Sequence, residues 1–161
     1  RILDGGLAAW ERAGYQIVGG PGNLGRGQAQ EVVAGQLPVA TIDEVKNFDG
    51  VLIDTREANR YAGRKERLDL KAGHIPGAVS VPTREILNPD NTFRPAEEIR
   101  ATFEKVGVTD PNNVIVYSGS GVHSAQAIAA MHHAGLPGAA LYLGGWSQWC
   151  ADRNNPVERS D

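Results

Sequence analysis

Runs of apolar residues separated by polar turns divide residues 38–155 into alternating strands and helices. Strands are predicted at VLID (51–54), GAVSVP (77–82), NVIVY (113–117) and AALYL (139–143). The run at 113–117 has too few polar residues for a one-sided strand, so we expect it at the centre of a sheet, covered on both faces. Segments with helical character lie between the strands. This alternation predicts an α/β fold with a mostly parallel sheet.

Helix boundaries follow from capping residues and periodicity. Thr41 and Glu44 have the spacing of a capping box, so a short helix begins there. Pro95 suits the first position of a second helix. This helix has one apolar face and a terminating glycine: Ile99, Phe103, Val106 and Gly107. A third helix is predicted from about Ser124 to Ala134, before a glycine and a proline.

The N-terminal part of the chain repeats a pattern found near the other end. Two glycines, three further residues and then a tryptophan occur twice, as Gly5, Gly6 and Trp10 and as Gly144, Gly145 and Trp149. The pattern suggests a tandem repeat of which the first copy contributes only its last strand, turn and helix. We therefore expect residues 1–19 to be the tail of a first domain, 20–37 a polar linker, 38–155 a complete domain and 156–161 a tail.

Composition and charge narrow the function classes. The 161 residues are 41% hydrophobic and 22% charged, with a formal net charge of −3, which gives no reason to expect nucleic acid or an anionic membrane as partner. No apolar run approaches membrane-spanning length, and residues 1–30 lack the layout of a signal peptide. Cys150 is the single cysteine, so a cytoplasmic protein without internal disulfides is expected. Four histidines and one cysteine give no zinc-like spacing, and neither a metal nor a cofactor is expected.

The segment SGSGVH (118–123) follows the predicted central strand and precedes a helix. Ligands of open parallel sheets bind at the carboxyl ends of strands. Backbone N–H groups of such a loop can converge on one point, and the helix N-terminus adds partial positive charge. Gly119 and Gly121 permit the backbone curl that this needs. The segment predicts an anion cradle around the side chain of Ser118, although a plain strand–helix connection accounts for the same glycines.

Three chemistries use a loop of this kind. A phosphate-binding loop needs a lysine followed by serine or threonine, which is absent. A serine-hydrolase elbow needs Gly-x-Ser-x-Gly, but Ser118 stands where the first glycine before Ser120 belongs. The third option places a cysteine at the first loop position, where the cradle lowers its pKa. Here that position is Ser118.

Five segments together resemble the tandem-domain rhodanese family of sulfurtransferases: YSGSGVHSAQAIAAM (117–131), VLIDTREANRYAG (51–63), GHIPGAVSVP (73–82), LYLGGWSQW (141–149) and DGGLAAWERAGY (4–15). The resemblance implies a three-layer domain with five parallel strands flanked by helices. It also implies an activity in which a cysteine persulfide carries sulfane sulfur from 3-mercaptopyruvate or thiosulfate to cyanide or a thiol. An N-terminal rhodanese-like domain is the implied partner and forms part of the active-site wall.

Carried over residue by residue, the resemblance places Ser118 at the nucleophile position, which is cysteine in the family. The loop around the persulfide then comprises Gly119, Ser120, Gly121, Val122 and His123. The neutral pair at 119–120 resembles the mercaptopyruvate subgroup. Arg60 and Arg67 match the two arginines that hold the substrate carboxylate and keto oxygens, a task suited to guanidinium forks. A surface or structural role is the alternative for Arg60, and a solvated position for Arg67.

The resemblance leaves other residues with ordinary roles. His74 and Pro76 are expected to shape a turn, and Asp54 to fix backbone amides. Trp146 and Trp149 are expected to pack in the core, with Trp146 a weak candidate for the pocket wall; Cys150 is taken as an incidental thiol. His123 stands where the family has threonine, and either alters the pocket or caps the following helix.

Ser118 changes the functional expectation. A serine hydroxyl stays protonated without a strong base, and oxygen does not form the persulfide that the mechanism needs. The chain is therefore expected to be inactive as written. Either a genuine sulfurtransferase carries serine in place of cysteine, or the protein is a non-catalytic module that binds an anion or a partner. A phosphatase is disfavoured, because Ser124 and Ala125 stand where its loop arginine belongs.

Overall fold

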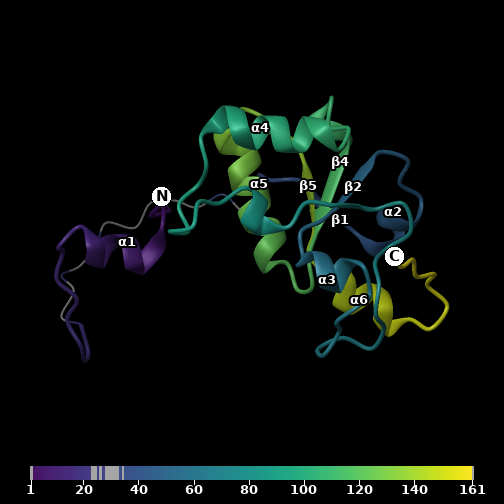
Figure 1. The fold of residues 1–161 in the computed structure, drawn as a ribbon, viewed down its shortest axis with the longest axis horizontal. Coiled ribbons are helices and arrows are strands. Elements are labelled where there is room, and N and C mark those ends of the chain that lie inside the picture. Colours follow the sequence, from purple (N-terminus) through teal and green to yellow (C-terminus); the bar gives the residue numbers. More distant parts are fainter. Residues whose placement is uncertain (1, 23–24, 26, 28–32, 34, 161) are drawn as a thin grey trace.

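A computed structural model describes residues 2–22, 25, 27, 33 and 35–160. Its centre is a five-stranded sheet of order β1-β5-β4-β2-β3, in which all neighbours are parallel (Figure 1). The strands are β1 (Val39–Ala40), β2 (Val51–Asp54), β3 (Val79–Ser80), β4 (Val114–Tyr117) and β5 (Ala140–Tyr142). The predicted α/β architecture is confirmed. The expected linker at 20–37 lies in part outside the described residues.

The apolar run at 113–117 forms the middle strand β4, as predicted. All four of its residues are buried, and it pairs with β2 on one side and β5 on the other. Alternate side chains point to opposite faces: Val114 and Val116 belong to one core cluster, and Ile115 and Tyr117 to the other. A strand that contributes to two cores has no solvent-facing side, which explains its lack of polar residues.

The two edge strands differ most from the sequence prediction. β1 was not predicted from the apolar pattern; its two residues pair with Leu141 and Tyr142. β3 is shorter than the predicted strand at 77–82. Gly77, with φ 77°, belongs to the turn before β3. Pro82 lacks the N–H that a ladder needs, so regular pairing ends at Ser80.

Helices cover both faces of the sheet and create the two cores (Figure 1). On one face lie α4 (Ala96–Lys105) and α5 (Val122–His133), which contribute Ile99, Phe103, Ile128 and Met131. On the other lie α2 (Ile42–Lys46), α3 (Ala58–Tyr61) and α6 (Gly145–Ala151), which contribute Val45, Tyr61, Trp146 and Trp149. Short 3-10 helices occur at Thr83–Glu85 and Pro111–Asn113.

Helix termini bear out most of the capping prediction. The side chain of Thr41 accepts from the Glu44 amide, and the Glu44 carboxylate accepts from the Thr41 amide, which completes the capping box. The position of Pro95 was predicted wrongly: it is the N-cap of α4, because its ψ of 143° is extended. α5 begins at Val122 rather than near Ser124, since Gly121, with φ 88°, turns the chain directly into the helix.

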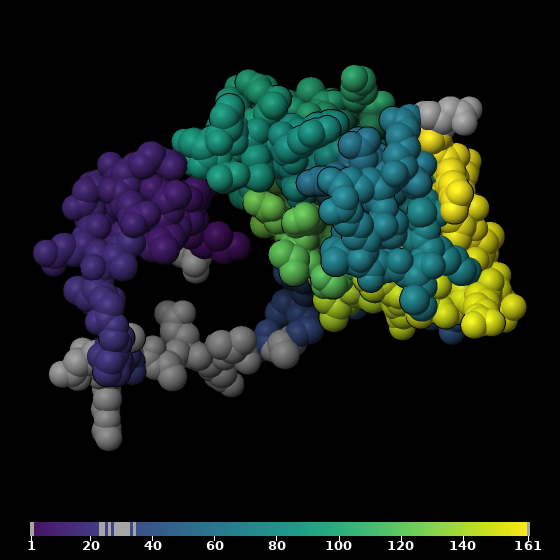
Figure 2. Space-filling model, turned by 60° about the horizontal axis from the view of Figure 1, so that its bottom comes forward, coloured from purple at the N-terminus to yellow at the C-terminus, as the bar shows by residue number. Residues whose placement is uncertain are grey.

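The N-terminal helix α1 (Gly6–Arg12) stands apart from the sheet (Figures 1 and 2). None of its residues is buried. It is attached to the segment before α4, where the Phe93 amide donates to Asp4 Oδ1 at 2.9 Å and Arg12 pairs with Asp90 at 3.4 Å. These two polar contacts hold the N-terminal segment beside residues 88–93.

Candidate active site

Ser118 follows β4 at the carboxyl edge of the sheet and is 2% exposed. Its Oγ accepts a hydrogen bond from the Gly121 amide at 3.0 Å and lies 3.1 Å from Ser124 Oγ. Ser124 Oγ donates to Gly121 O at 3.0 Å, an arrangement in which Ser118 donates its own proton to Ser124. The two hydroxyls and the Gly121 peptide groups therefore form a closed ring. Its members include neither an imidazole nor a carboxylate that could remove the Ser118 proton.

The N-terminus of α6 holds the loop from outside. The Trp146 amide donates to Ser118 O at 2.8 Å, and the Ser147 amide donates to Gly119 O at 3.1 Å. Both carbonyls are thus turned toward α6. Gly145 makes this approach possible: it has φ 55°, and a Cβ there would overlap Ser118 O and lie 2.7 Å from Gly119 O. The second glycine of the Gly-Gly-x-x-x-Trp pattern is therefore required by the loop it supports.

The two loop glycines have different roles, which corrects the sequence prediction for one of them. Gly121 has the left-handed backbone that was expected, with φ 88°. Gly119 does not have a positive φ, so it is not needed for the curl. A Cβ at position 119 would meet Arg60 Nη1 at 3.7 Å, an ordinary contact. Gly119 therefore lies beside Arg60.

The remaining loop residues lie at an open rim. Ser120, Val122 and His123 are exposed. The N-cap of α5 is Gly121, without a side-chain cap hydrogen bond, so the alternative that His123 caps the helix is wrong. The amides of Val122, His123 and Ser124 belong to the first turn of a twelve-residue helix and have no acceptor within it. These amides are therefore available to a ligand, and the anion cradle stays a prediction.

The structure brings Arg60 to the loop, but not Arg67. Arg60 projects from α3, where Nε and Nη2 donate to Glu66 and Nη2 also donates to Asp69 at 2.7 Å. Arg67 is exposed and shares with Arg60 a pocket of about 280 Å³. No contact joins Arg67 to residues 118–123 within the described part of the chain. The two arginines thus lie on one pocket wall, and Arg60 is the one beside Gly119.

Arg56 is the residue of the site region that sequence reasoning missed. It is fully buried: Nη2 donates to Asp54 at 2.6 Å and to Gly73 O at 2.6 Å, and its guanidinium carbon lies 4.7 Å from the centre of the Trp146 ring. Burial lowers the pKa of Arg56, but the hydrogen bonds and charge of Asp54 outweigh it, so the pKa is raised. Arg56 therefore stays charged. The available signal was Asp-x-Arg directly after a buried strand.

The auxiliary residues have mainly structural positions. Asp54 accepts from the Arg56 amide at 2.9 Å, as expected of a residue that fixes backbone amides. His74 stacks on Tyr61 and its Nδ1 lies 2.8 Å from Tyr61 O, within the predicted turn. Trp146 is fully buried and donates to Lys71 O, so it is core rather than pocket wall. Cys150 is buried in α6, and its thiol donates to Ser147 O.

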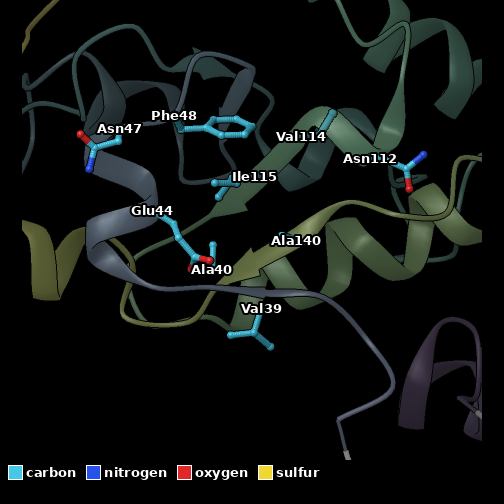
Figure 3. A pocket seen from close by; sticks show the side chains of 9 residues that line it. All are labelled: Val39, Ala40, Glu44, Asn47, Phe48, Asn112, Val114, Ile115 and Ala140. Atoms are coloured by element: carbon cyan, nitrogen blue, oxygen red, sulfur yellow. The ribbon is translucent and has the colours of Figure 1, made fainter.

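A separate pocket lies away from the loop, beside β1 and α2 (Figure 3). Its volume is about 380 Å³, and its lining is mainly apolar, with Val39, Phe48 and Ile115 among the members. The one carboxylate that lines it, Glu44, is held by Thr41 in the capping box. Among the described residues, no three histidine, cysteine or acidic side chains gather as metal ligands. The same part of the chain contains no helix with the length and hydropathy to cross a membrane.

Comparison with known sequences decides the family. The profile of the Rhodanese-like domain matches residues 39–152, which span the sheet, the loop and α6. The chain belongs to the rhodanese family. A Mycobacterium tuberculosis protein named for thiosulfate sulfurtransfer is 37% identical over 99% of this chain and 57% of its own length. The 3-mercaptopyruvate sulfurtransferase of Escherichia coli K12 is 33% identical over 98% of the chain and 57% of the relative. The chain thus spans less than two thirds of these rhodanese relatives.

Solved structures of rhodanese-type proteins share the fold. The 3-mercaptopyruvate sulfurtransferase of Leishmania major superimposes with a TM-score of 0.76 at 33% identity, covering 89% of this chain and 41% of that one. The anaerobic ergothioneine biosynthesis enzyme of Chlorobium limicola, solved with trimethyl histidine, superimposes with a TM-score of 0.84 at 26% identity. The superposition includes 100% of this chain and 41% of the Chlorobium limicola enzyme. The five-stranded, three-layer prediction is confirmed.

Proposed function

We propose that this chain carries the catalytic-type domain of a sulfurtransferase that moves sulfane sulfur from 3-mercaptopyruvate or thiosulfate to cyanide or a thiol. We also propose that Ser118 makes it inactive as written. The observation that carries the proposal is the position of the 118 side chain. It is buried at the end of the central strand, accepts the Gly121 amide, and belongs to a loop that α6 holds in place.

The chemistry follows if a cysteine thiolate occupies this position. The Gly121 amide and the helix start stabilise the negative sulfur and lower its pKa. The thiolate attacks the sulfane sulfur of the donor. A sulfur–sulfur bond forms, and the donor's bond to that sulfur breaks. The electron pair leaves with sulfite, or with the enolate of pyruvate, which takes a proton. A thiolate or cyanide acceptor then attacks the outer sulfur and restores the cysteine thiolate.

Ser118 interrupts this sequence at its first step. Its proton lies in the ring with Ser124 and Gly121, and no base adjoins it there. An alkoxide would have to form in a buried site, and its oxygen would not carry sulfane sulfur as a stable persulfide. Binding is a different matter, because the loop amides and Arg60 do not depend on the nucleophile. The same geometry therefore supports donor binding without turnover.

We further propose Arg60 as the main carboxylate-binding residue and Arg67 as a second contact from the same pocket. Arg60 Nη1 faces the loop at Gly119, and Arg67 reaches the pocket from the charged segment after α3. The neutral Gly119–Ser120 pair suits a monoanionic keto acid better than a loop with two cations would. With Ser120 and His123 exposed at the rim, both can contact a bound donor or acceptor.

The decisive experiment is the Ser118→Cys variant assayed with each donor and with cyanide or a thiol as acceptor. We expect thiocyanate or sulfide release and a persulfide on the protein, detected as a mass gain of one sulfur. Ser118→Cys combined with Cys150→Ala should behave alike, whereas Ser118→Ala and the unsubstituted chain should form no persulfide. If Ser118→Cys transfers no sulfur, the enzyme proposal fails. A phosphate-ester assay on the same variant tests the phosphatase alternative.

The second candidate is a non-catalytic module that binds an anion or a partner protein. The closed ring favours it, because the loop in the described structure satisfies both hydroxyls without a ligand. The candidate predicts that the unsubstituted chain binds anions and that Ser118→Cys adds no sulfur transfer. The assay above therefore separates the two.

We propose that residues 1–19 are the tail of a first rhodanese-like domain, that 20–37 link it to the catalytic-type domain at 38–155, and that this first domain is a partner of the site. The support is the match between α1 and α6: Gly6 and Gly145 have φ 58° and 55°, and each precedes a tryptophan at the same spacing. Adding the first domain should bury Trp10, measured by loss of acrylamide quenching. We also propose a cytoplasmic location, where thiol acceptors stay reduced; subcellular fractionation checks this.

A further inference from the structure

Arg60 is held by two carboxylates from the segment that follows α3. Glu66 binds it side-on, through Nε at 3.2 Å and Nη2 at 3.1 Å. Asp69 accepts from Nη2 at 2.7 Å. Both acidic side chains are well covered, with 5% of Glu66 and 8% of Asp69 exposed. Charged groups this buried interact more strongly than a surface ion pair.

The two carboxylates are themselves anchored. Glu66 Oε1 accepts from the amides of Arg67, Leu68 and Asp69. Asp69 Oδ1 accepts from the Ser147 hydroxyl at 2.6 Å. The amide of Ser147 also donates to Gly119 O. Asp69 therefore connects Arg60 to the same residue of α6 that supports the loop.

The geometry leaves Arg60 with half of a binding fork. An end-on fork uses one N–H of Nη1 and one of Nη2. Nη1 faces Gly119, and no hydrogen-bond acceptor for it occurs among the described residues. Because Glu66 binds Arg60 side-on, it accepts the Nη2 hydrogen of Arg60 that lies on the side of Nε. Asp69 accepts the second Nη2 hydrogen of Arg60, which lies on the side of Nη1 and is the one that an end-on fork uses.

We propose that Asp69 is a specificity-determining residue that occupies this fork in the free protein and is displaced from Arg60 when a donor anion binds. The proposal rests on the proposed role of Arg60 in holding the donor. Binding then exchanges the Asp69 carboxylate for the donor anion on Arg60, while Asp69 stays bound to Ser147. The displaced Asp69 remains close to the ligand, so its negative charge selects against ligands of higher negative charge.

Charge accounting gives the expected selectivity. Arg56 pairs with Asp54 and also lies 3.7 Å from Glu66, so Arg56, Arg60, Asp54, Glu66 and Asp69 form one cluster with a net charge of −1. The repulsion between Asp69 and the ligand is proportional to the charge of the ligand. It is therefore twice as large for dianionic thiosulfate as for monoanionic 3-mercaptopyruvate. Doubling a free energy squares the corresponding ratio of affinities.

The test is equilibrium binding of 3-mercaptopyruvate and thiosulfate to Asp69→Asn at low ionic strength. The Ser118 protein suits this, since it is expected to bind without turnover. Removing one charge about 7 Å from the ligand, at an effective dielectric constant of about 40 and with slight screening, should through the lost repulsion alone tighten 3-mercaptopyruvate roughly fivefold and thiosulfate roughly 25-fold. Asparagine keeps an oxygen for Ser147 and cannot accept from Arg60 through its amide nitrogen.

Two matched variants make the result specific. Glu104→Gln removes the same charge from an exposed position in α4 and should change neither affinity by more than about 1.5-fold, because solvent and salt screen it. Asp69→Ala should give the same ranking of the two ligands if asparagine packs poorly at the site. Thermal unfolding of each variant checks that the fold is retained.

The outcomes distinguish the proposed role of Asp69 from the proposed role of Arg60 in binding the donor. If Arg60→Gln leaves the binding of both anions unchanged, Arg60 is not the donor contact and both proposals are lost. If Arg60→Gln weakens binding but Asp69→Asn matches Glu104→Gln, only the role of Asp69 is overturned. The same holds if thiosulfate gains no more than 3-mercaptopyruvate. If neither the unsubstituted chain nor Asp69→Asn binds either anion, the role of Asp69 is likewise rejected.

Discussion

The helices α1 and α6 begin with the same pattern and end in different surroundings. Each has two glycines, three further residues and then a tryptophan, and Gly6 and Gly145 share a left-handed backbone. α6 buries Gly145, Trp146, Trp149 and Cys150, whereas α1 buries none of its residues. The pattern therefore encodes the turn and the helix. Burial depends on whether a loop at the end of a strand lies against the helix start.

The amides at the two helix starts show the same contrast. Trp146 and Ser147 donate to the carbonyls of Ser118 and Gly119. The equivalent amides of Leu7 and Ala8 reach no other segment of the described chain. A Cβ on Gly6 would meet nothing within 4 Å, whereas one on Gly145 would overlap the active-site loop. Glycine is thus required for packing at one site and only for backbone conformation at the other.

The largest expected difference is between the two tryptophans. Trp149→Ala should lower the free energy of unfolding by about 3–5 kcal/mol, because a fully packed indole is lost; Trp149 is 3% exposed and donates to Pro156 O. Trp10→Ala should cost about 1 kcal/mol or less, since Trp10 is 39% exposed and its contacts, with the Tyr15 ring and Gln16 O, lie within the exposed N-terminal segment. Urea unfolding of both variants measures the pair. Equal losses would show that α1 is as well packed as α6.

The second difference concerns the glycines. Gly145→Ala should cost roughly 3 kcal/mol, the sum of left-handed strain and overlap with Ser118 O. Gly6→Ala should cost only the strain, about 1–2 kcal/mol. In the Ser118→Cys background, Gly145→Ala should also abolish sulfur transfer, because the loop must move, while Gly6→Ala should not. Retained transfer in the Gly145 variant would contradict the role given to α6.

The surroundings of α1 and α6 should also differ in how their stability depends on pH. Burial raises the pKa of Glu66, but hydrogen bonds from the Leu68 and Asp69 amides and from Arg60 lower it more, so the folded pKa lies below the ordinary 4.5. The unfolded chain then binds more protons, and the contribution of Glu66 is present above about pH 4.5 and lost as the pH falls through the folded pKa. Glu66→Gln should flatten this part of the stability curve, measured by urea unfolding from pH 6 to pH 3. Beside α1, hydrogen bonds from Thr92 lower the pKa of Asp90. Because Asp90 is exposed, Asp90→Asn should change the pH dependence of stability less than Glu66→Gln does. An unchanged slope in the Glu66 variant would contradict the assignment.

The smallest effect is expected at the ion pair that attaches α1. Arg12 and Asp90 are about half exposed and 3.4 Å apart. A double-mutant cycle with Arg12→Ala and Asp90→Ala should give a coupling energy below about 0.5 kcal/mol, as for exposed pairs generally. A coupling above about 1 kcal/mol would mean that α1 docks on this domain more firmly than its exposure indicates.

The sequence predicted the central strand and the loop better than the edges of the sheet. β4 was recognisable because a strand buried on both faces must be apolar throughout. β1 has two residues and no periodicity of its own, and its pairing depends on Leu141 and Tyr142 far along the chain. The length of β3 was overestimated because the residues on both sides of it, in the preceding turn and up to Pro82, are apolar as well.

The sequence was sufficient to predict site residues whose position depends on local backbone geometry. It was not sufficient for residues whose position depends on partners far away in the sequence. The position of Ser118 and the curl at Gly121 follow from a strand, two glycines and a helix. Arg56 was overlooked because only the folded chain brings Trp146 over its guanidinium. The segment GRKERLDLK (63–71) was expected to be solvated because it is rich in charge, yet Glu66 and Asp69 are covered by Arg60 and α6. Charge in sequence does not reveal which charges pair.

The pairing of β1 with β5 fixes the order in which this domain is assembled. Val39 pairs with Leu141, so β1 cannot join the sheet until β5 has been synthesised. A contact between residues so far apart in sequence forms late and slows folding. On the ribosome, β2, β3 and β4 can associate first, while the β4 edge stays open until β5 emerges. During this interval the unpaired edge of β4 can pair with strands of other chains.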